Sequence, residues 1–214
     1  MGQTPKHLKE TPSQTAGPYV HIGCTPNFCG IPGVYSQDLG AAMVNDRTKG
    51  PRITIVGCVR AGAGTVLRDA MVEIWQADAK GHYPLPPATP DTSDTPETSG
   101  DADPHFTGWG RCPTDMDTGA FRFDTIRPGP VPHRAGGLMA PHISVWIVAR
   151  GINLGLHTRM YFPDEAKANA VDPFLSRIED ADRAATLLAG SEGDGVYRFD
   201  IRLQGDGETI FLDV

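Results

Sequence analysis

Short apolar runs, separated by turns rich in Gly and Pro, dominate the pattern of this chain. Two of them show strand features clearly: residues 53–59 (ITIVGCV) are rich in β-branched side chains, and residues 70–77 (AMVEIWQA) alternate in character as a half-buried strand does. Similar short runs occur at residues 121–124, 142–149, 157–162, 196–203 and 208–212. The pattern therefore predicts at least seven strands, with residues 204–207 (QGDG) forming a hairpin turn between the last two.

Helical periodicity is confined to residues 172–188. Asp172 fits the N-cap position, and Pro173 fits the first helical position. Apolar residues then follow at three- and four-residue spacing, namely Leu175, Ile178, Ala181, Ala185 and Leu188. Many strands and one late helix favour an all-β protein, a β-sandwich, over a parallel α/β sheet.

Two regions lack this strand pattern. Residues 84–105 hold many Pro, Ser, Thr and Asp and few hydrophobic residues, which predicts a long surface loop. Residues 1–22 show no periodicity, and the prolines there favour an extended backbone. We therefore predict an extended N-terminal arm, residues 1–22, followed by one β-sandwich domain, residues 23–214.

Composition and charge exclude several classes of function. The chain has 214 residues and a formal net charge of -7, whereas nucleic-acid binding normally requires a basic face. No apolar run approaches the ~20 residues that span a bilayer, and residues 1–10 contain no apolar signal-peptide core. Cys24 and Cys29 have no second matched pair, so a zinc site is not predicted. We expect a reduced, cytoplasmic protein with neither a nucleic-acid nor a membrane partner.

Few residues in the chain could hold a metal ion. His142 begins a predicted strand, and a histidine two residues later would present a second imidazole on the same face, but that position is Ser144. A serine hydroxyl is a poor iron ligand at neutral pH because it must lose a proton with a high pKa. Tyr83 follows a Gly-His turn and could supply a phenolate. From these residues alone, a hydrogen-bonded structural histidine and a packed aromatic ring explain His142 and Tyr83 at least as well as metal binding does.

Three segments of the chain resemble a known family. They are residues 70–83, with the motifs WQAD and GHY, residues 119–131, running from GAFRF to PGPV, and residues 140–164, beginning APHIS. These segments resemble the intradiol ring-cleavage dioxygenases. The resemblance implies a transthyretin-like β-sandwich, and a family site in which two tyrosines and two histidines hold one ferric ion.

The resemblance also implies that the iron site of this chain is vestigial. By position, Tyr83 matches one family tyrosine and His142 one family histidine. The other two ligand positions hold Val131 and Ser144, and Met139 stands where the family has an arginine. The resemblance therefore predicts that this chain alone holds no iron.

A narrower resemblance covers both ends and the middle of the chain. Residues 10–23 (ETPSQTAGPYVHIG), 139–143, 149–159 and 197–209 resemble the alpha chains of a two-chain member of this family. This resemblance implies a beta subunit as partner, Fe(III) held by that beta subunit, and a higher-order hetero-oligomer of αβ protomers. It further implies that the complex uses O2 to cleave 3,4-dihydroxybenzoate (protocatechuate) to 3-carboxy-cis,cis-muconate.

The same resemblance implies which residues of this chain lie near the substrate. They are Thr15, Gly17, Pro18 and Tyr19 of the arm, with Arg150 near the entrance of the site. A cation there suits a substrate that is itself a carboxylate. From its position alone, Arg150 is better explained as a surface arginine at a strand end.

Two other functions stay open on the sequence alone. One is a self-sufficient homomeric dioxygenase with an unusual ligand set drawn from Tyr83, His133, His142 and another tyrosine. The other is a non-enzymatic binding module on the same fold. Iron bound by the isolated chain would favour the homomeric dioxygenase.

Overall fold

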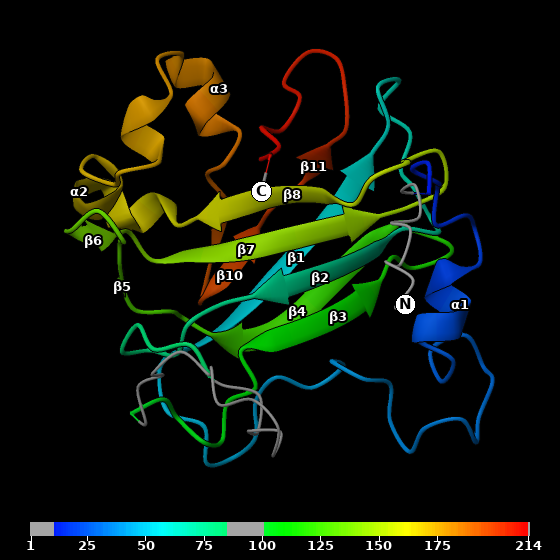
Figure 1. Cartoon of the computed structure of the whole chain (residues 1–214). Helices are drawn as coiled ribbons and strands as arrows, with labels where there is room; N and C mark the ends of the chain where they lie inside the picture. The colour runs from blue at the N-terminus through cyan, green and yellow to red at the C-terminus, as the bar shows by residue number, and fades with distance from the viewer. Residues whose placement is uncertain (1–10, 85–100, 214) are drawn as a thin grey trace, which may run out of the picture.

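The computed structural model describes residues 11–84 and 101–213, which form a sandwich of two β-sheets (Figure 1). The first sheet is built around β1 (Arg52–Arg60), the longest strand described. It pairs with β4 (Ala120–Ile126) in the antiparallel sense and with β10 (Val196–Arg198) and β11 (Ile201–Arg202) in the parallel sense. Beyond β10 lies β9 (Gly190–Gly193). The β-sandwich predicted from the sequence is thus confirmed.

The second sheet is antiparallel throughout and carries most of the residues of interest. Its strand order is β3 (Trp109–Pro113), β2 (Met71–Trp75), β7 (His142–Val148) and β8 (Leu156–Tyr161). A separate small hairpin joins β5 (Val131–Pro132) to β6 (Leu138–Met139). Residues His142 and Ser144 therefore lie on a central strand, flanked by β2 and β8.

The core lies between the two sheets and follows from the two-residue period of the strands. Alternate side chains of β1, β4 and β7 are buried there, among them Ile53, Ile55, Val59, Phe121, Phe123, Ile143, Val145 and Ile147. The intervening residues of β7, including Ser144, face the outer side of the second sheet. Its outer face, rather than the core, therefore holds the chemistry predicted for this strand.

The helical segments are short and lie at the ends of the sandwich. They are α1 (Val20–Cys24), α2 (Ala166–Asn169) and α3 (Ala181–Ala185), with 3-10 turns η1 (Pro163–Glu165) and η2 (Leu175–Arg177). Figure 1 shows α2 and α3 at one end of the sandwich and α1 at the other. Within the described residues, no helix is long and apolar enough to cross a membrane.

The helical region predicted near residues 172–188 is present, but it is interrupted. Asp172 does act as a cap, since its Oδ1 accepts hydrogen bonds from the N–H groups of Phe174 and Leu175, both at 2.9 Å. The backbone then becomes extended at Ile178 and at Asp180. Asp180 caps α3 with its own side chain, so a second helix start replaces the continuous helix.

The last predicted strand, residues 208–212, is wrong. Within the described chain this segment makes only an isolated bridge, between Leu212 and His157. The turn predicted at residues 204–207 does form, with Glu208 N–H donating to the Gly205 carbonyl at 2.9 Å. Beyond the turn, the N–H of Arg202 donates a hydrogen bond to the hydroxyl of Thr209 at 3.0 Å. In a continuous strand a backbone carbonyl would accept that bond, so the strand pairing ends here.

Four strands escaped the sequence pattern, namely the two-residue strands β5 and β6, together with β3 and β9. β3 contains Gly110 and ends at Pro113, and β9 is a Gly-Ser-Glu-Gly segment. Gly and Pro weaken strand propensity, so neither run shows the alternation that identifies a strand. The run at residues 196–203 is also divided, into β10 and β11.

The described part of the N-terminal arm, residues 11–22, is extended only in part. Residues 11–17 form no helix or strand, whereas α1 begins at Val20, so the extended backbone predicted for residues 20–22 is wrong. The carbonyl of Tyr19 accepts hydrogen bonds from two N–H groups of this helix. These bonds turn the backbone directly after Pro18. Residues 1–10 of the arm and residues 85–100 of the predicted loop lie outside the described residues.

Candidate metal and substrate sites

Two of the family-like segments pack against each other beside Tyr83. Asp78 accepts hydrogen bonds at Oδ1 from two N–H groups of the following turn, at 2.8 and 3.0 Å. Gly81 in this turn has φ +87°, and a Cβ there would lie 2.0 Å from the carbonyl oxygen of Pro130. Gly129 N–H also donates to the Asp78 carbonyl at 2.8 Å. Only glycine permits so close an approach, so these contacts fix the turn that leads to Tyr83.

His142 is buried at the start of β7, with 1% of its surface exposed. Its Nδ1 lies 2.7 Å from the carbonyl oxygen of Ala140, and its ring lies 5.7 Å from that of Tyr161, its partner in β8. Burial is the main cause that lowers the pKa of His142 to about 4. The imidazole is therefore neutral at pH 7.

Arg159 places a positive charge near both candidate ligands. It pairs with Ser144 across β7 and β8, so its side chain lies on the face that also carries His142. Its charge further lowers the pKa of His142. Burial raises the pKa of Tyr83, and the same Arg159 charge partly offsets that rise. A guanidinium therefore lies near both Tyr83 and His142.

Neighbouring side chains hold Arg159 in this position. Its Nη1 lies 3.5 Å from the Tyr161 hydroxyl oxygen and 3.7 Å from the Met139 sulfur. Its guanidinium carbon lies 5.3 Å from the centre of the Phe174 ring. Polar and aromatic contacts therefore surround the cation, and no contact in this set requires a metal.

Asp172 completes the cluster as a buried carboxylate. None of its surface is exposed, and its Oδ2 accepts a hydrogen bond from Ala140 N–H at 2.8 Å. Its Oδ1 accepts one from the Tyr161 hydroxyl at 3.3 Å, in addition to the two cap bonds. Burial raises the pKa of Tyr161, so this hydroxyl stays protonated and can donate. We call Tyr83, His142, Arg159, Tyr161 and Asp172 the inner cluster.

Sequence reasoning missed Arg159 and Tyr161 as members of this cluster. Both lie on a strand two residues apart, and they meet His142 and Ser144 only through strand pairing. The alternation of polar residues at His157, Arg159 and Tyr161 was the available signal, but a single sequence does not show which strand lies beside it.

The inner cluster does not fit a ferric ion. Ser144 shares a face with His142, as expected, but it brings a hydroxyl instead of an imidazole, and Val131 in β5 has no donor atom. The raised pKa of Tyr83 opposes the phenolate form that a ferric ligand needs, and the Arg159 charge repels a second cation. Among the described residues, no group of three or more His, Cys, Asp and Glu side chains is arranged to hold a metal.

The residues expected near the substrate lie at the opposite end of β7. A strand of seven residues spans roughly 20 Å, and Arg150 follows it after one further residue. The Arg150 side chain is 68% exposed, and its Nε lies 2.9 Å from Oδ2 of Asp69. Arg150 is therefore an anchored but accessible cation, far from the inner cluster.

The arm reaches the same turn. The Thr15 hydroxyl donates to the Ala149 carbonyl at 3.2 Å and accepts from Gly151 N–H at 3.0 Å, so it bonds to both neighbours of Arg150. Gly17, Pro18 and Tyr19 follow, and Tyr19 is 75% exposed. The structure thus brings Thr15 to the Arg150 turn and leaves the Tyr19 ring largely uncovered by this chain.

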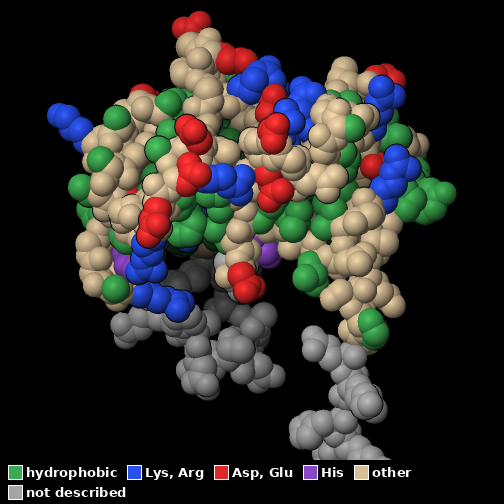
Figure 2. Space-filling view, turned by 90° about the horizontal axis from the view of Figure 1, so that it is seen from above, with side chains coloured by type: hydrophobic (Ala, Val, Ile, Leu, Met, Phe, Trp, Pro, Cys, Tyr) green, Lys and Arg blue, Asp and Glu red, His purple; other side chains and the backbone are tan. Residues whose placement is uncertain are grey.

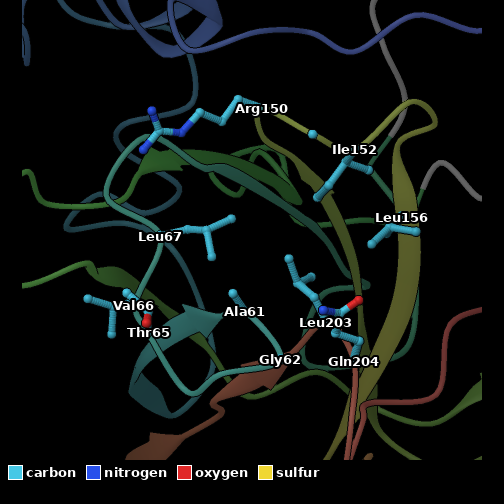
Figure 3. A pocket seen from close by; sticks show the side chains of 11 residues that line it. Ala61, Gly62, Thr65, Val66, Leu67, Arg150, Ile152, Leu156, Leu203 and Gln204 are labelled. Carbon is cyan, nitrogen blue, oxygen red and sulfur yellow. The ribbon is translucent and has the colours of Figure 1, made fainter.

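A cavity of about 500 Å³ opens beside Arg150 (Figure 3). Figure 3 shows Leu67, Ile152 and Leu156 directed toward this hollow, with Arg150 along its rim. A mostly apolar hollow with one charged group at the edge has the usual character of a binding region. At the opposite end of β7, by contrast, His142 and Asp172 are buried.

Charged side chains elsewhere do not separate by sign. Figure 2 shows Lys and Arg beside Asp and Glu across the described part of the face it presents. Ion pairs on the described surface include Arg122 with Asp124 and Arg198 with Glu192. This face therefore offers no basic patch for a phosphate backbone.

Comparisons with known proteins agree with the fold and identify the family. A family model described as dioxygenase matches residues 25–205. The chain is 43% identical to the protocatechuate 3,4-dioxygenase alpha chain of Pseudomonas putida, over 96% of this chain and 97% of that one. It is 39% identical to the corresponding alpha chain of Burkholderia cepacia, over 97% and 98% of the two chains. It is 34% identical to the beta chain from the same organism, over 78% of this chain and 71% of that one.

A solved structure shows the same architecture. The dioxygenase domain of a dioxygenase–carbohydrate-binding fusion protein from Streptomyces sp. SirexAA-E aligns with a TM-score of 0.54 and 27% identity, covering 84% of this chain and 96% of that one. A β-sandwich with this site frame defines an intradiol-type dioxygenase fold, and the chain belongs to the dioxygenase family. Within that family it groups with the protocatechuate 3,4-dioxygenase alpha chains, which it matches over nearly its whole length.

Proposed function

We propose that this chain works as the alpha subunit of a protocatechuate 3,4-dioxygenase whose beta subunit holds the ferric iron. The αβ complex cleaves 3,4-dihydroxybenzoate between its two hydroxylated carbons and inserts both atoms of O2, giving 3-carboxy-cis,cis-muconate. The beta-subunit iron makes the bound catechol reactive toward O2. This chain contributes binding and orientation at the entrance of that site.

The inner cluster is the observation that carries this proposal. The chain keeps the frame of a dioxygenase site around Tyr83 and His142, yet Arg159 adds a cation there and two donor positions are lost. A chain of this family that lacks enough side chains to bind iron requires a second chain to supply the metal for catalysis. The existence of beta-chain relatives supports that division of roles.

The exposed apolar residues support a partner on one side of the molecule. Half of the large hydrophobic residues exposed in the described chain fall within residues 19–39, namely Tyr19, Phe28, Ile31, Val34, Tyr35 and Leu39. Asp38 fixes this segment, because its carboxylate accepts hydrogen bonds from Asn27 N–H at 2.9 Å and Phe28 N–H at 2.7 Å. An ordered segment with outward apolar side chains suits a protein interface, which we assign to the beta subunit in a higher-order assembly.

At the Arg150 turn, the proposed role is electrostatic. Arg150 attracts the carboxylate of the substrate toward the beta-subunit site, and Thr15, Gly17, Pro18 and Tyr19 line the approach. The exposure of Arg150 and the contact of Thr15 with the same turn support this assignment. A cytoplasmic location suits the four cysteines, all of which are free thiols in the structure.

Separate and joint purification tests the proposal. The chain is prepared alone, the beta chain is prepared alone, and the two are co-expressed; iron content and O2 uptake with protocatechuate are then measured for each. We expect this chain alone to contain no bound iron and to show no O2 uptake, and the complex to have both. Stoichiometric iron and ring cleavage in the isolated chain would instead establish the homomeric dioxygenase using Tyr83, His133 and His142. A complex that binds protocatechuate without consuming O2 would point to a binding module.

A further inference from the structure

We infer that Asp69 and Thr15 are positioning residues that hold Arg150 ready for the substrate carboxylate. This inference rests on the proposed function, since it concerns how Arg150 performs the role assigned to it there. Neither residue needs to touch the substrate. Asp69 restrains the side chain of Arg150, and Thr15 restrains the backbone that carries it.

Asp69 is placed beneath the arginine in a way that orients it. Its side chain is 8% exposed, whereas the Arg150 side chain is 68% exposed, so the anion is inside and the cation outside. The contact, at 2.9 Å, is made with Nε, the inner nitrogen of the guanidinium. The two terminal nitrogens extend beyond this contact, and these are the atoms of an arginine that best reach a free carboxylate from outside.

The second oxygen of Asp69 strengthens this interpretation. Within the described residues, Asp69 Oδ1 is buried and has no hydrogen-bond partner. A buried carboxylate without full hydrogen bonding is costly to keep, and within the described residues Asp69 forms its ion pair with Arg150. Asp69 is therefore not explained as a cap or as part of a larger hydrogen-bond network.

Thr15 restrains the same turn through the two residues that flank Arg150 in the chain. One hydroxyl bonds to the carbonyl of Ala149 and to the N–H of Gly151, at 3.2 and 3.0 Å. Gly151 has φ +80°, so the turn is tight at this position. Because Thr15 belongs to the arm, the arm and Arg150 are fixed relative to each other.

The charge and the position of Asp69 predict opposite effects on substrate binding. Its negative charge lowers the positive potential at Arg150, so removing the charge alone should tighten the binding of a carboxylate. Its restraint of the side chain saves the entropy of ordering an arginine on binding, so removing the restraint should weaken binding by roughly two- to tenfold. The sign of the change in the dissociation constant therefore distinguishes a positioning role of Asp69 from a purely electrostatic one.

The experiment measures the dissociation constant of the assembled αβ complex for protocatechuate by calorimetry, without O2 so that no turnover occurs. We expect Asp69→Ala to raise this constant by roughly two- to fivefold, and Asp69→Asn, which removes the charge but keeps an acceptor oxygen for Nε, to leave it within about twofold. Asp124→Ala is the matched control, because it removes one aspartate of an exposed ion pair on the other sheet. In an Arg150→Ala background, Asp69→Ala should have no further effect.

The Thr15 hydroxyl is tested by a conservative pair. Thr15→Val keeps the shape and loses the hydroxyl, and should raise the dissociation constant by roughly two- to threefold, while Thr15→Ser should restore it. If Asp69→Ala does not assemble, the Thr15 variants decide the question. A lower constant in Asp69→Ala, an Asp69→Ala effect that persists without Arg150, or an Arg150→Ala complex that binds normally overturns the inference. Failure of the proposed function is a separate result, because it appears in the unmodified complex, either as no binding of protocatechuate or as binding without O2 uptake once O2 is admitted.

Discussion

The two ends of strand β7 have opposite properties. At its first residue, His142 is buried among Tyr161, Arg159 and Asp172, and the charges and polar atoms of this inner cluster contact one another. Just past its last residue, Arg150 is 68% exposed beside an apolar hollow, and the arm binds the same turn. At the first end, which we call the closed end, the polar groups bond to one another within the chain. At the second, the open end, the charged group of Arg150 is accessible from outside.

This difference shows how one sandwich can keep a site frame and change its use. At the closed end, the Arg159 cation lies near Tyr83 and His142, the two residues that match ligand positions of the family's metal site, and the Asp172 carboxylate lies near His142. Their charges are present there in place of a metal ion and its full set of ligands. Such a buried cluster contributes to folding or conformational uniqueness rather than to chemistry. At the open end, exposure keeps Arg150 available to another molecule. Substitutions at the two ends should therefore change different measured quantities.

The largest effect is expected for Asp172→Ala at the closed end. This change leaves three backbone N–H groups and the Tyr161 hydroxyl without their acceptor, inside the protein. We expect the free energy of unfolding to fall by about 3–5 kcal/mol, measured by urea denaturation. Asp180→Ala, which removes an exposed cap, should cost about 1 kcal/mol. Equal losses in the two variants would contradict the description of the inner cluster as a buried network.

The pH dependence of stability should follow His142. Its pKa is lowered to about 4 in the folded chain, from 6.5, so the unfolded chain binds a proton that the folded chain does not. The stabilisation is complete above pH 6.5, decreases as the pH falls from 6.5 toward 4, and changes no further below that. The loss should reach at most about 3 kcal/mol across this window.

His142→Gln tests the source of that dependence. This variant should show a flatter profile between pH 6.5 and 4 in urea-unfolding experiments. His157→Gln, which changes an exposed histidine in the neighbouring strand β8, should keep the original profile. An unchanged slope in His142→Gln would assign the acid sensitivity to other groups.

The sequence predicted the sandwich because its central strands have a clear two-residue period, as in β1 and β7. It did not predict the interrupted helix, since Asp172 and Asp180 are both good caps and only the backbone at Ile178 decides between one helix and two. The absence of donors at Val131 and Ser144 was visible in the sequence. The arginine near them was not, because Arg159 meets Ser144 only through strand pairing. Long-range pairing is the information that a single sequence lacks.

Assembly should depend on the apolar segment near the open end. Phe28→Asp in residues 19–39 should weaken the association of this chain with its beta subunit by about 30-fold, or about 2 kcal/mol, because a charge would replace a buried interface ring. Analytical ultracentrifugation of the two purified chains measures this constant. Met116→Asp is the matched control, since it also introduces a charge at an exposed hydrophobic residue, outside the segment. Equal weakening in both variants would show that the segment has no special role in the interface.

The smallest of these effects is expected for Arg150→Ala, and it should appear in KM rather than in stability. Without the guanidinium, the carboxylate of protocatechuate loses an attractive charge at the entrance, and KM should rise about tenfold at low salt, or about 1.4 kcal/mol, with kcat within about twofold. Because the Debye length is only ~8 Å at physiological ionic strength, added salt should raise KM of the unmodified complex more than that of the variant. Steady-state O2 uptake at several salt concentrations measures both, with Arg122→Ala as an exposed-arginine control. If KM of an assembled Arg150→Ala complex stays unchanged at low salt, Arg150 is a surface residue, and the two ends of β7 differ in exposure but not in function.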